Sequence, residues 1–171
     1  MAEKQIGFTD LIGRSGVSKA EQRFEAIGAI DESSAAISLA KSFCEHRERR
    51  ELLERSQQDL SMIMSELAGM KQFSFSSPGV LSPIQQALAW LESTVAELKT
   101  KIGNPRKFIF GGSNQLSGAL NLARAVTRRA EREVLRLYEA EGPTDEAIAQ
   151  YLNRLSLMIF LLEIEAETKA G

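Results

Sequence analysis

The residues with the clearest chemical potential in this sequence are two arginines and a glutamate within residues 123–132. Arg124, Arg128 and Glu131 are spaced at i, i+4 and i+7, which places them on one side of a helix. At about 100° per residue, they fall on the flank of an apolar stripe. The stripe consists of Ala123, Val126, Ala130, Val134 and Leu137. The pattern predicts two guanidinium groups that are partly buried and still reach a cleft.

A guanidinium group at such a boundary needs an acidic partner or a phosphate, because an unpaired buried charge is costly. The same spacing is typical of a solvated helix face with internal Arg–Glu pairs, each of which contributes little to stability. Spacing alone leaves both interpretations open.

The rest of the composition excludes several kinds of site. The chain of 171 residues has one cysteine, Cys44, and one histidine, His46. It therefore lacks the residues for an internal disulfide or a Cys/His zinc site, and no metal site is predicted. A di-iron bundle needs Glu-x-x-His motifs, but Phe43 stands three residues before His46. We expect His46 to lie on the surface in a charged turn and Cys44 to be partly buried near a helix end.

Charge and hydropathy restrict the partners and the compartment. The chain has 21 basic and 23 acidic residues, a formal net charge of −2, so no global field attracts nucleic acid. Residues 1–10 lack the basic flank and apolar stretch of a secretion signal. No apolar run approaches the roughly 20 residues that span a bilayer. We expect a cytoplasmic protein that binds neither nucleic acid nor a membrane.

Five segments have helical periodicity, and turn residues separate them. The helices are predicted over about 18–46, 50–70, 83–101, 114–140 and 145–167. Ser18 to Glu21 is typical of a capping box, and Ser82-Pro83 is typical of an N-cap followed by proline at the first helical position. Ser113 or Asn114 can cap the fourth helix.

The segments between these helices are predicted to be irregular. Residues 1–17 contain three glycines and no sustained pattern, so they are predicted to be a loop, and residues 72–79 form a serine-rich loop. Residues 107–113 form a short apolar element that ends in two glycines before Ser113. The fold class is therefore all-α. After the N-terminal segment 1–17, residues 18–171 form a single domain, a five-helix antiparallel bundle.

Three blocks of the sequence resemble the signatures of one enzyme family. Residues 108–132 run from Phe108 through a glycine turn into Ala-Arg-Ala-Val-Thr-Arg-Arg-Ala-Glu-Arg. Residues 151–156 read Tyr-Leu-Asn-Arg-Leu-Ser, and residues 24–32 read Phe-Glu-Ala-Ile-Gly-Ala-Ile-Asp-Glu. In this order and spacing the chain resembles the PduO-type ATP:cob(I)alamin adenosyltransferases. The resemblance implies a cobalamin adenosyltransferase-like bundle with ferritin-like up-down packing.

The resemblance also implies an activity and an assembly. Family members are trimers whose active sites lie between neighbouring subunits, so a homotrimer is expected. They transfer the 5′-deoxyadenosyl group of ATP to the cobalt of cob(I)alamin and release triphosphate. ATP, Mg²⁺ and cobalamin would bind, a reductase would supply cob(I)alamin, and an adenosylcobalamin-dependent enzyme would receive the product.

Individual residues acquire roles from the same resemblance. Arg128 and Glu131 would contact ATP, with the arginine neutralising phosphate charge as triphosphate departs. Asn153 would also face ATP, and Lys19 corresponds to a lysine near the phosphates. Phe108 corresponds to the aromatic residue that displaces the lower axial ligand of cobalamin. Without the resemblance, an ordinary aromatic residue of the core is an equally good interpretation of Phe108.

Five more residues are assigned in this way. Asp31 and Arg124 correspond to a salt-bridged pair that crosses the subunit interface beside the corrinoid site. Gly7, Thr9 and Arg14 belong to the nucleotide-binding N-terminal segment.

The N-terminal segment departs from the family pattern. The family usually has Thr-Gly-Asp-x-Gly-x-Thr, whereas residues 3–9 read Glu-Lys-Gln-Ile-Gly-Phe-Thr. Smaller departures are Gly111-Gly112-Ser113 in place of Pro-Gly-Gly, Asn121 in place of a common His, and Leu157 in place of a frequent Asp. Two hypotheses stay open: an adenosyltransferase with an altered phosphate loop, or a non-catalytic homologue that binds or delivers a corrinoid.

Overall fold

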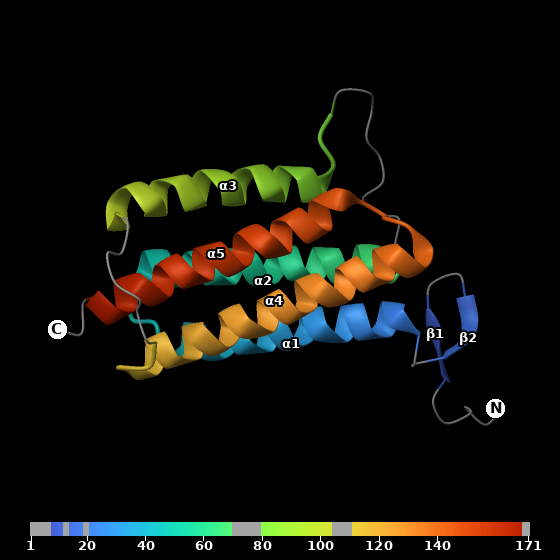
Figure 1. The fold of residues 1–171 in the computed structure, drawn as a ribbon, viewed down its shortest axis with the longest axis horizontal. Coiled ribbons are helices and arrows are strands. Elements are labelled where there is room, and N and C mark those ends of the chain that lie inside the picture. The colour runs from blue at the N-terminus through green and yellow to red at the C-terminus, as the bar shows by residue number, and fades with distance from the viewer. Residues whose placement is uncertain (1–7, 12–13, 19–20, 70–79, 104–110, 169–171) are drawn as a thin grey trace.

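Five helices lie side by side in an elongated bundle (Figure 1). The computed structural model describes residues 8–11, 14–18, 21–69, 80–103 and 111–168. The helices are α1 (Gln22–Ser42), α2 (Arg47–Leu67), α3 (Pro83–Ile102), α4 (Gln115–Glu141) and α5 (Glu146–Thr168). The prediction of an all-α five-helix bundle is confirmed.

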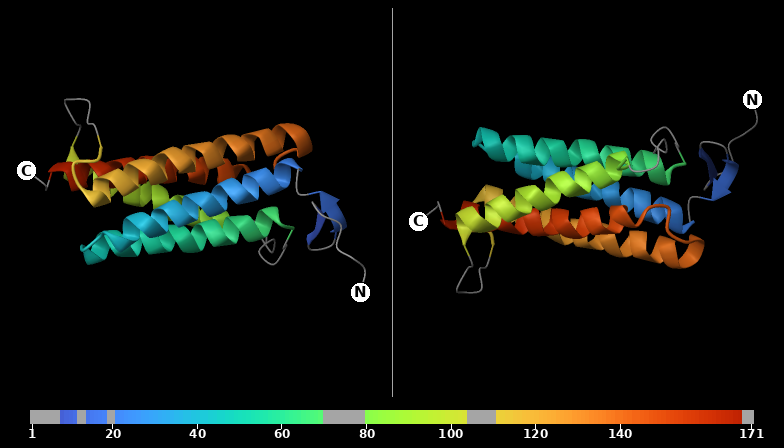
Figure 2. Two further views of the ribbon diagram at one scale, coloured as in Figure 1. Left: turned by 90° about the horizontal axis from the view of Figure 1, so that it is seen from below. Right: turned by 90° about the horizontal axis from the view of Figure 1, so that it is seen from above.

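Consecutive helices run in opposite directions. In α1 and α2, the Arg23 Nη1 atom donates to the Leu67 carbonyl at 2.6 Å, at the start of one helix and the end of the other. In α4 and α5, the contacts join residues 121 with 163 and 131 with 153, which requires an antiparallel pair. The main packed pairs are α1 with α4, α4 with α5, α3 with α5, and α1 with α2 (Figure 2).

A short antiparallel hairpin precedes the bundle. Strand β1 (Phe8–Leu11) pairs with β2 (Arg14–Ser18), and Thr9 lies opposite Val17. The hairpin stands at one end of the bundle, beside the start of α1 (Figure 1). The prediction that residues 1–17 form a loop is therefore wrong for the residues of these two strands. Strands of four and five residues are too short for alternation to reveal, and a positive φ of 67° at Gly16 breaks the pattern further.

The helix starts test the capping predictions. Ser82 accepts a hydrogen bond from the Gln85 backbone and begins α3, and Asn114 does the same with Ser117 for α4, so both predicted caps are confirmed. The capping box predicted at Ser18 is wrong. Ser18 ends strand β2, and α1 is capped by Glu21 without a side-chain hydrogen bond. Strand β2 extends through Ser18, and α1 begins only at Gln22, whereas an N-cap residue directly precedes the first helical residue.

Helix α5 is the central element, because it packs against both α3 and α4 and also contacts α2. It is long and apolar enough to cross a membrane by length and composition alone, and 67% of its apolar window is buried inside the protein. The expectation that no apolar run approaches that length is therefore wrong. A helix surrounded by other helices is apolar on all sides, as a membrane-spanning helix is.

A buried pair of hydroxyls joins α1 to α4. The Ser33 and Thr127 hydroxyls lie 2.7 Å apart, and both residues are fully buried. Four of the five residues of the predicted α4 stripe are buried, but Val126 is only partly buried and Thr127 takes its place. Burying a threonine is possible here because its hydroxyl bonds both Ser33 and the Ala123 carbonyl.

A buried carboxylate fixes α2 against α5. Asp59 Oδ2 accepts a hydrogen bond from the Tyr151 hydroxyl at 3.0 Å, and Asp59 Oδ1 accepts one from Arg55 Nε at 3.1 Å. The Arg55 guanidinium carbon also lies 5.3 Å from the ring centre of Trp90 on α3. Burial raises the pKa of Asp59, although Arg55 and Tyr151 oppose the shift. The network connects α2, α3 and α5.

Because Tyr151 is fully buried and its hydroxyl satisfies Asp59, Tyr151→Phe should lower the free energy of unfolding by about 1–2 kcal/mol. Urea denaturation measures the change. The matched control is Tyr138→Phe, whose hydroxyl bonds the Asp145 carbonyl in a partly exposed position where water can replace it. Equal losses in the two variants would contradict a special role for the buried pair.

The turn before α4 is fastened to the end of α5. Glu167 Oε1 accepts hydrogen bonds from the backbone nitrogens of Gly112 at 2.8 Å and Ser113 at 3.1 Å. Gly112 has a φ of 110°, which favours glycine. Hydrogen bonds from Ser113, Ser117 and these amides lower the pKa of Glu167 to about 2. The charged form of Glu167 thus holds the turn.

The lowered pKa predicts a pH-dependent stability. A carboxyl group whose pKa falls on folding adds stability above its unfolded pKa, and that stability is lost as pH falls through the folded pKa. The melting temperature of Glu167→Gln should therefore lie below that of the wild type above pH 4.5, and the gap should close towards pH 2. Glu139→Gln is the control, because the described residues offer that exposed glutamate no hydrogen-bond partner. A gap that is constant with pH would contradict the assignment.

Candidate functional site

The outer side of the α4–α5 seam brings together two of the predicted nucleotide-binding residues. Asn153 Nδ2 on α5 donates a hydrogen bond to Glu131 Oε1 on α4 at 2.9 Å. The two residues are 22 positions apart in sequence, and their meeting depends on the antiparallel packing of the two helices. Arg128 precedes Glu131 by three residues on α4, so it lies on the same side of the helix.

Arg128 is exposed, and the prediction that it is partly buried is wrong. It follows the buried Thr127, and the helix rotation of about 100° per residue carries its side chain out of the seam between α1 and α4. No ion-pair partner for its guanidinium occurs among the residues that the structure describes. The side chain is therefore available to an anionic ligand.

Arg124 is partly buried, as predicted, with 31% of its side chain exposed. Its Nε atom lies 3.2 Å from Glu163 Oε2, and its guanidinium carbon lies 5.8 Å from the ring centre of Phe160. Its predicted partner Asp31 is exposed on α1. Within this single chain Arg124 pairs with Glu163, and the predicted pairing with Asp31 concerns a second subunit.

Sequence reasoning missed Glu163, although a signal was present. The residue is 1% exposed and sits in an apolar run on the last helix, where an ionisable residue requires a partner. Its Oε1 atom accepts a hydrogen bond from Asn121 Nδ2 at 2.7 Å. Asn121, noted as a departure from the family pattern, is thus one of two donors to a buried carboxylate.

Gly111 fits closely against this carboxylate. A Cβ atom at Gly111 would lie 2.2 Å from Glu163 Oε1 and 2.7 Å from Asn121 Nδ2. Both distances are shorter than real carbon contacts, so any other residue would displace either the turn or the Glu163 and Asn121 side chains.

The remaining predicted site residues belong to the first 19 residues and to the stretch before α4. Gly7, Lys19 and Phe108 lie outside the described residues. Thr9 lies in β1, and Arg14 begins β2 opposite Leu11, but only their backbone positions are described.

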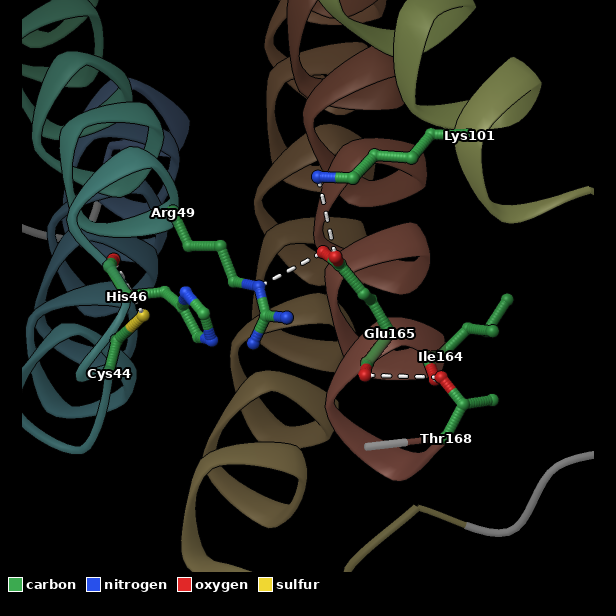
Figure 3. Close-up of polar contacts among 7 residues, drawn as sticks. All are labelled: Cys44, His46, Arg49, Lys101, Ile164, Glu165 and Thr168. Carbon is green, nitrogen blue, oxygen red and sulfur yellow. Dashed lines mark hydrogen bonds and ion pairs between the residues drawn. The ribbon is translucent and has the colours of Figure 1, made fainter. Parts of the chain in front are cut away.

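A second polar cluster lies where α2, α3 and α5 meet (Figure 3). Arg49 Nε lies 2.9 Å from Glu165 Oε2, and Lys101 Nζ lies 3.5 Å from Glu165 Oε1. Arg49 Nη2 is buried and has no hydrogen-bond partner among the described residues. Burial raises the pKa of the neighbouring Cys44 thiol, which disfavours the thiolate form. The exposed His46 matches the prediction of a surface residue, whereas Cys44 is more deeply buried than predicted.

A surface groove of about 380 Å³ separates α2 from α3. Its lining contains three glutamates, Glu48, Glu51 and Glu97, and one lysine, Lys101. This charge balance is unsuited to a triphosphate, and none of the predicted site residues lines the groove. Among the described residues, no three His, Cys, Asp or Glu side chains are grouped to hold a metal ion.

Comparison with known proteins identifies the family of the chain. The family model described as cobalamin adenosyltransferase matches residues 2–166. The corrinoid adenosyltransferase PduO of Citrobacter freundii is 31% identical over 156 residues, which are 91% of this chain and 46% of that protein. The chain therefore spans about half the length of that relative.

Other relatives match over more of their length. The corrinoid adenosyltransferase of Mycobacterium leprae is 32% identical over 166 residues, 95% of this chain and 87% of that protein. The human corrinoid adenosyltransferase MMAB is 32% identical over 176 residues, 96% of this chain and 67% of that protein.

Solved structures show the same fold. A variant PduO-type ATP:corrinoid adenosyltransferase from Lactobacillus reuteri, complexed with cobalamin and ATP, superposes with a TM-score of 0.78 at 29% identity, covering 94% of this chain and 88% of that chain. The match to the family model extends over nearly the whole chain and includes all three blocks of residues quoted above. The chain belongs to the cobalamin adenosyltransferase family.

Proposed function

We propose that this chain transfers the 5′-deoxyadenosyl group of ATP to the cobalt of cob(I)alamin and releases triphosphate. The observation that carries the proposal is the hydrogen bond from Asn153 to Glu131, one helical turn from Arg128, whose guanidinium has no ion-pair partner among the described residues. In this reaction the electron pair of cob(I) forms the bond to the ribose 5′ carbon. The bond between that carbon and the phosphate oxygen breaks, and its electrons leave with triphosphate.

The protein's part in this step is to position the nucleotide and to stabilise the departing charge. Arg128 supplies a guanidinium with no competing partner among the described residues, which suits the oxygens of a triphosphate. Asn153 orients Glu131 through Oε1 and leaves Oε2 to accept a hydrogen bond from the nucleotide.

For the corrinoid, the proposal rests on Phe108, which the resemblance assigns as the apolar residue that excludes a lower axial ligand. It also rests on a second subunit, because Asp31 and the outer nitrogens of Arg124 are open to a partner chain. Both helices that would meet that partner expose large apolar side chains, namely Leu39 of α1, its C-cap residue Phe43, and Leu122 and Leu135 of α4. These features support the homotrimer that the resemblance implies.

Mg²⁺ would bind together with ATP, because this ion is usually held by substrate phosphates and one or two carboxylates. A reductase would supply cob(I)alamin, and an adenosylcobalamin-dependent enzyme would take the product. A cytoplasmic location suits these partners.

The altered sequence of residues 3–9 favours a second candidate, a corrinoid-binding homologue without activity. Calorimetry with ATP and Mg²⁺ separates the two candidates. The enzyme should bind ATP with measurable heat and convert chemically reduced cobalamin to adenosylcobalamin in a spectroscopic assay. Tight cobalamin binding with no heat from ATP would favour the carrier.

Arg128→Ala should lower kcat/KM for adenosyl transfer by about 100-fold, because it removes a charge that stabilises the leaving triphosphate. The spectroscopic adenosylation assay measures the change. Arg136→Ala is the matched control, an exposed arginine of the same helix that pairs with Glu133 two turns from Arg128. Unchanged turnover in Arg128→Ala would remove this residue from the proposed site.

A further inference from the structure

The buried carboxylate of Glu163 is held by two donors from one neighbouring helix. Asn121 and Arg124 lie one turn apart on α4 and bond separate oxygens of Glu163, at 2.7 Å and 3.2 Å. A charge that is 1% exposed requires such partners, because water cannot replace them. The three side chains therefore adopt one mutual arrangement.

This arrangement leaves the outer part of Arg124 unused. Glu163 bonds only the Nε atom, and the described residues offer the two Nη atoms no hydrogen-bond partner. A guanidinium has five donor hydrogens in a fixed plane, so a bond at Nε sets the direction of the other four. Glu163 thus orients Arg124 from its buried side while the exposed side stays open.

The same carboxylate also lies against the turn before α4. Gly111, three residues after Phe108, approaches Glu163 Oε1 so closely that a Cβ atom would overlap with it. Glu167, four residues further along α5, holds the next two backbone nitrogens. Glu167 therefore holds this turn by hydrogen bonds, and the carboxylate of Glu163 leaves space only for glycine at its start.

We propose that Glu163 is a positioning residue for the corrinoid side of the active site, acting through Arg124 and the Gly111 turn. The inference rests on the proposed function, because it takes the roles of Arg124 and Phe108 from there. Glu163 need not touch either substrate. Its effect should therefore appear in the use of cobalamin and not in the use of ATP.

The test replaces the carboxylate by a side chain of similar length with no strong acceptor. Glu163→Met should raise the KM for cob(I)alamin about tenfold, because small misplacements of positioning groups are costly. The KM for ATP should change less than about twofold, since Arg128, Glu131 and Asn153 make no described contact with Glu163. Glu163→Gln, which keeps one acceptor oxygen for Arg124, should restore part of the loss.

Asp59→Leu is the matched control. Asp59 is also a buried carboxylate that accepts hydrogen bonds from an arginine Nε and one other donor, but its partners are Arg55 and Tyr151. It should lower the melting temperature as Glu163→Met does and leave the KM for cob(I)alamin unchanged. Amide exchange at Gly112 and Ser113 should accelerate about tenfold in Glu163→Met alone, because a methionine side chain in place of the carboxylate disturbs the close approach of the neighbouring Gly111.

The outcomes distinguish this inference from the proposed function. If the wild type converts cobalamin and Glu163→Met matches Asp59→Leu in both KM values and in amide exchange, the positioning role is wrong and the function stands. Equal rises in both KM values would likewise contradict it, since a general loss of structure would then explain the data. If the wild type transfers no adenosyl group, the proposed function itself is wrong, and the inference fails with it.

Discussion

The central constraint in this structure is the burial of α5. A helix covered by its neighbours can carry ionised side chains only where each charge meets a partner, because water is not available to solvate it. Glu163 and Glu165, at 1% and 6% exposure, are two residues apart and so point to opposite sides of the helix. The first meets α4, and the second meets Arg49 of α2 and Lys101 of α3.

These pairs restrict how the bundle can assemble. Apolar side chains tolerate a helix sliding by a turn, whereas a buried carboxylate is satisfied in only one register. The bond from Tyr151 to Asp59 adds the same restriction near the middle of α2. The contacts of Glu163 with α4 agree with the register in which Asn153 reaches Glu131 on the outside of the seam.

The sequence predicts the helices well where local chemistry dominates. Ser82 and Asn114 cap helices through bonds within their own first turn, so the sequence alone locates them. Ser18 has the same local pattern, but pairing with β1 overrides it, and a local signal cannot report a tertiary contact. The burial of Thr127 in place of Val126 could not be predicted either, because its hydrogen-bond partner Ser33 lies 94 residues away in the sequence.

In the candidate site, too, the sequence indicates individual residues but not their tertiary contacts. The resemblance assigns Glu131 and Asn153 to ATP from separate blocks, and the structure adds a hydrogen bond between them that the sequence did not predict. Glu163 lies outside every block, and only its place in an apolar run indicates burial, without naming Asn121 or Arg124 as partners. The exposure of Arg128 could not be predicted either, since spacing locates a residue on a helix but not the depth to which neighbours cover it.

Charged residues of α4 and α5 therefore divide into two kinds. A group that binds a ligand must keep its hydrogen-bonding capacity free in the unliganded protein, and the exposed Arg128, which we propose for this role, has no ion-pair partner among the described residues. A group that holds others in place must use its capacity internally, as Glu163 does in the core. Arg124 combines both properties, because Nε is bonded inside the chain while the described residues offer its Nη atoms no hydrogen-bond partner. In the trimer that the resemblance implies, Arg124 would therefore transmit the packing of α5 to the neighbouring subunit.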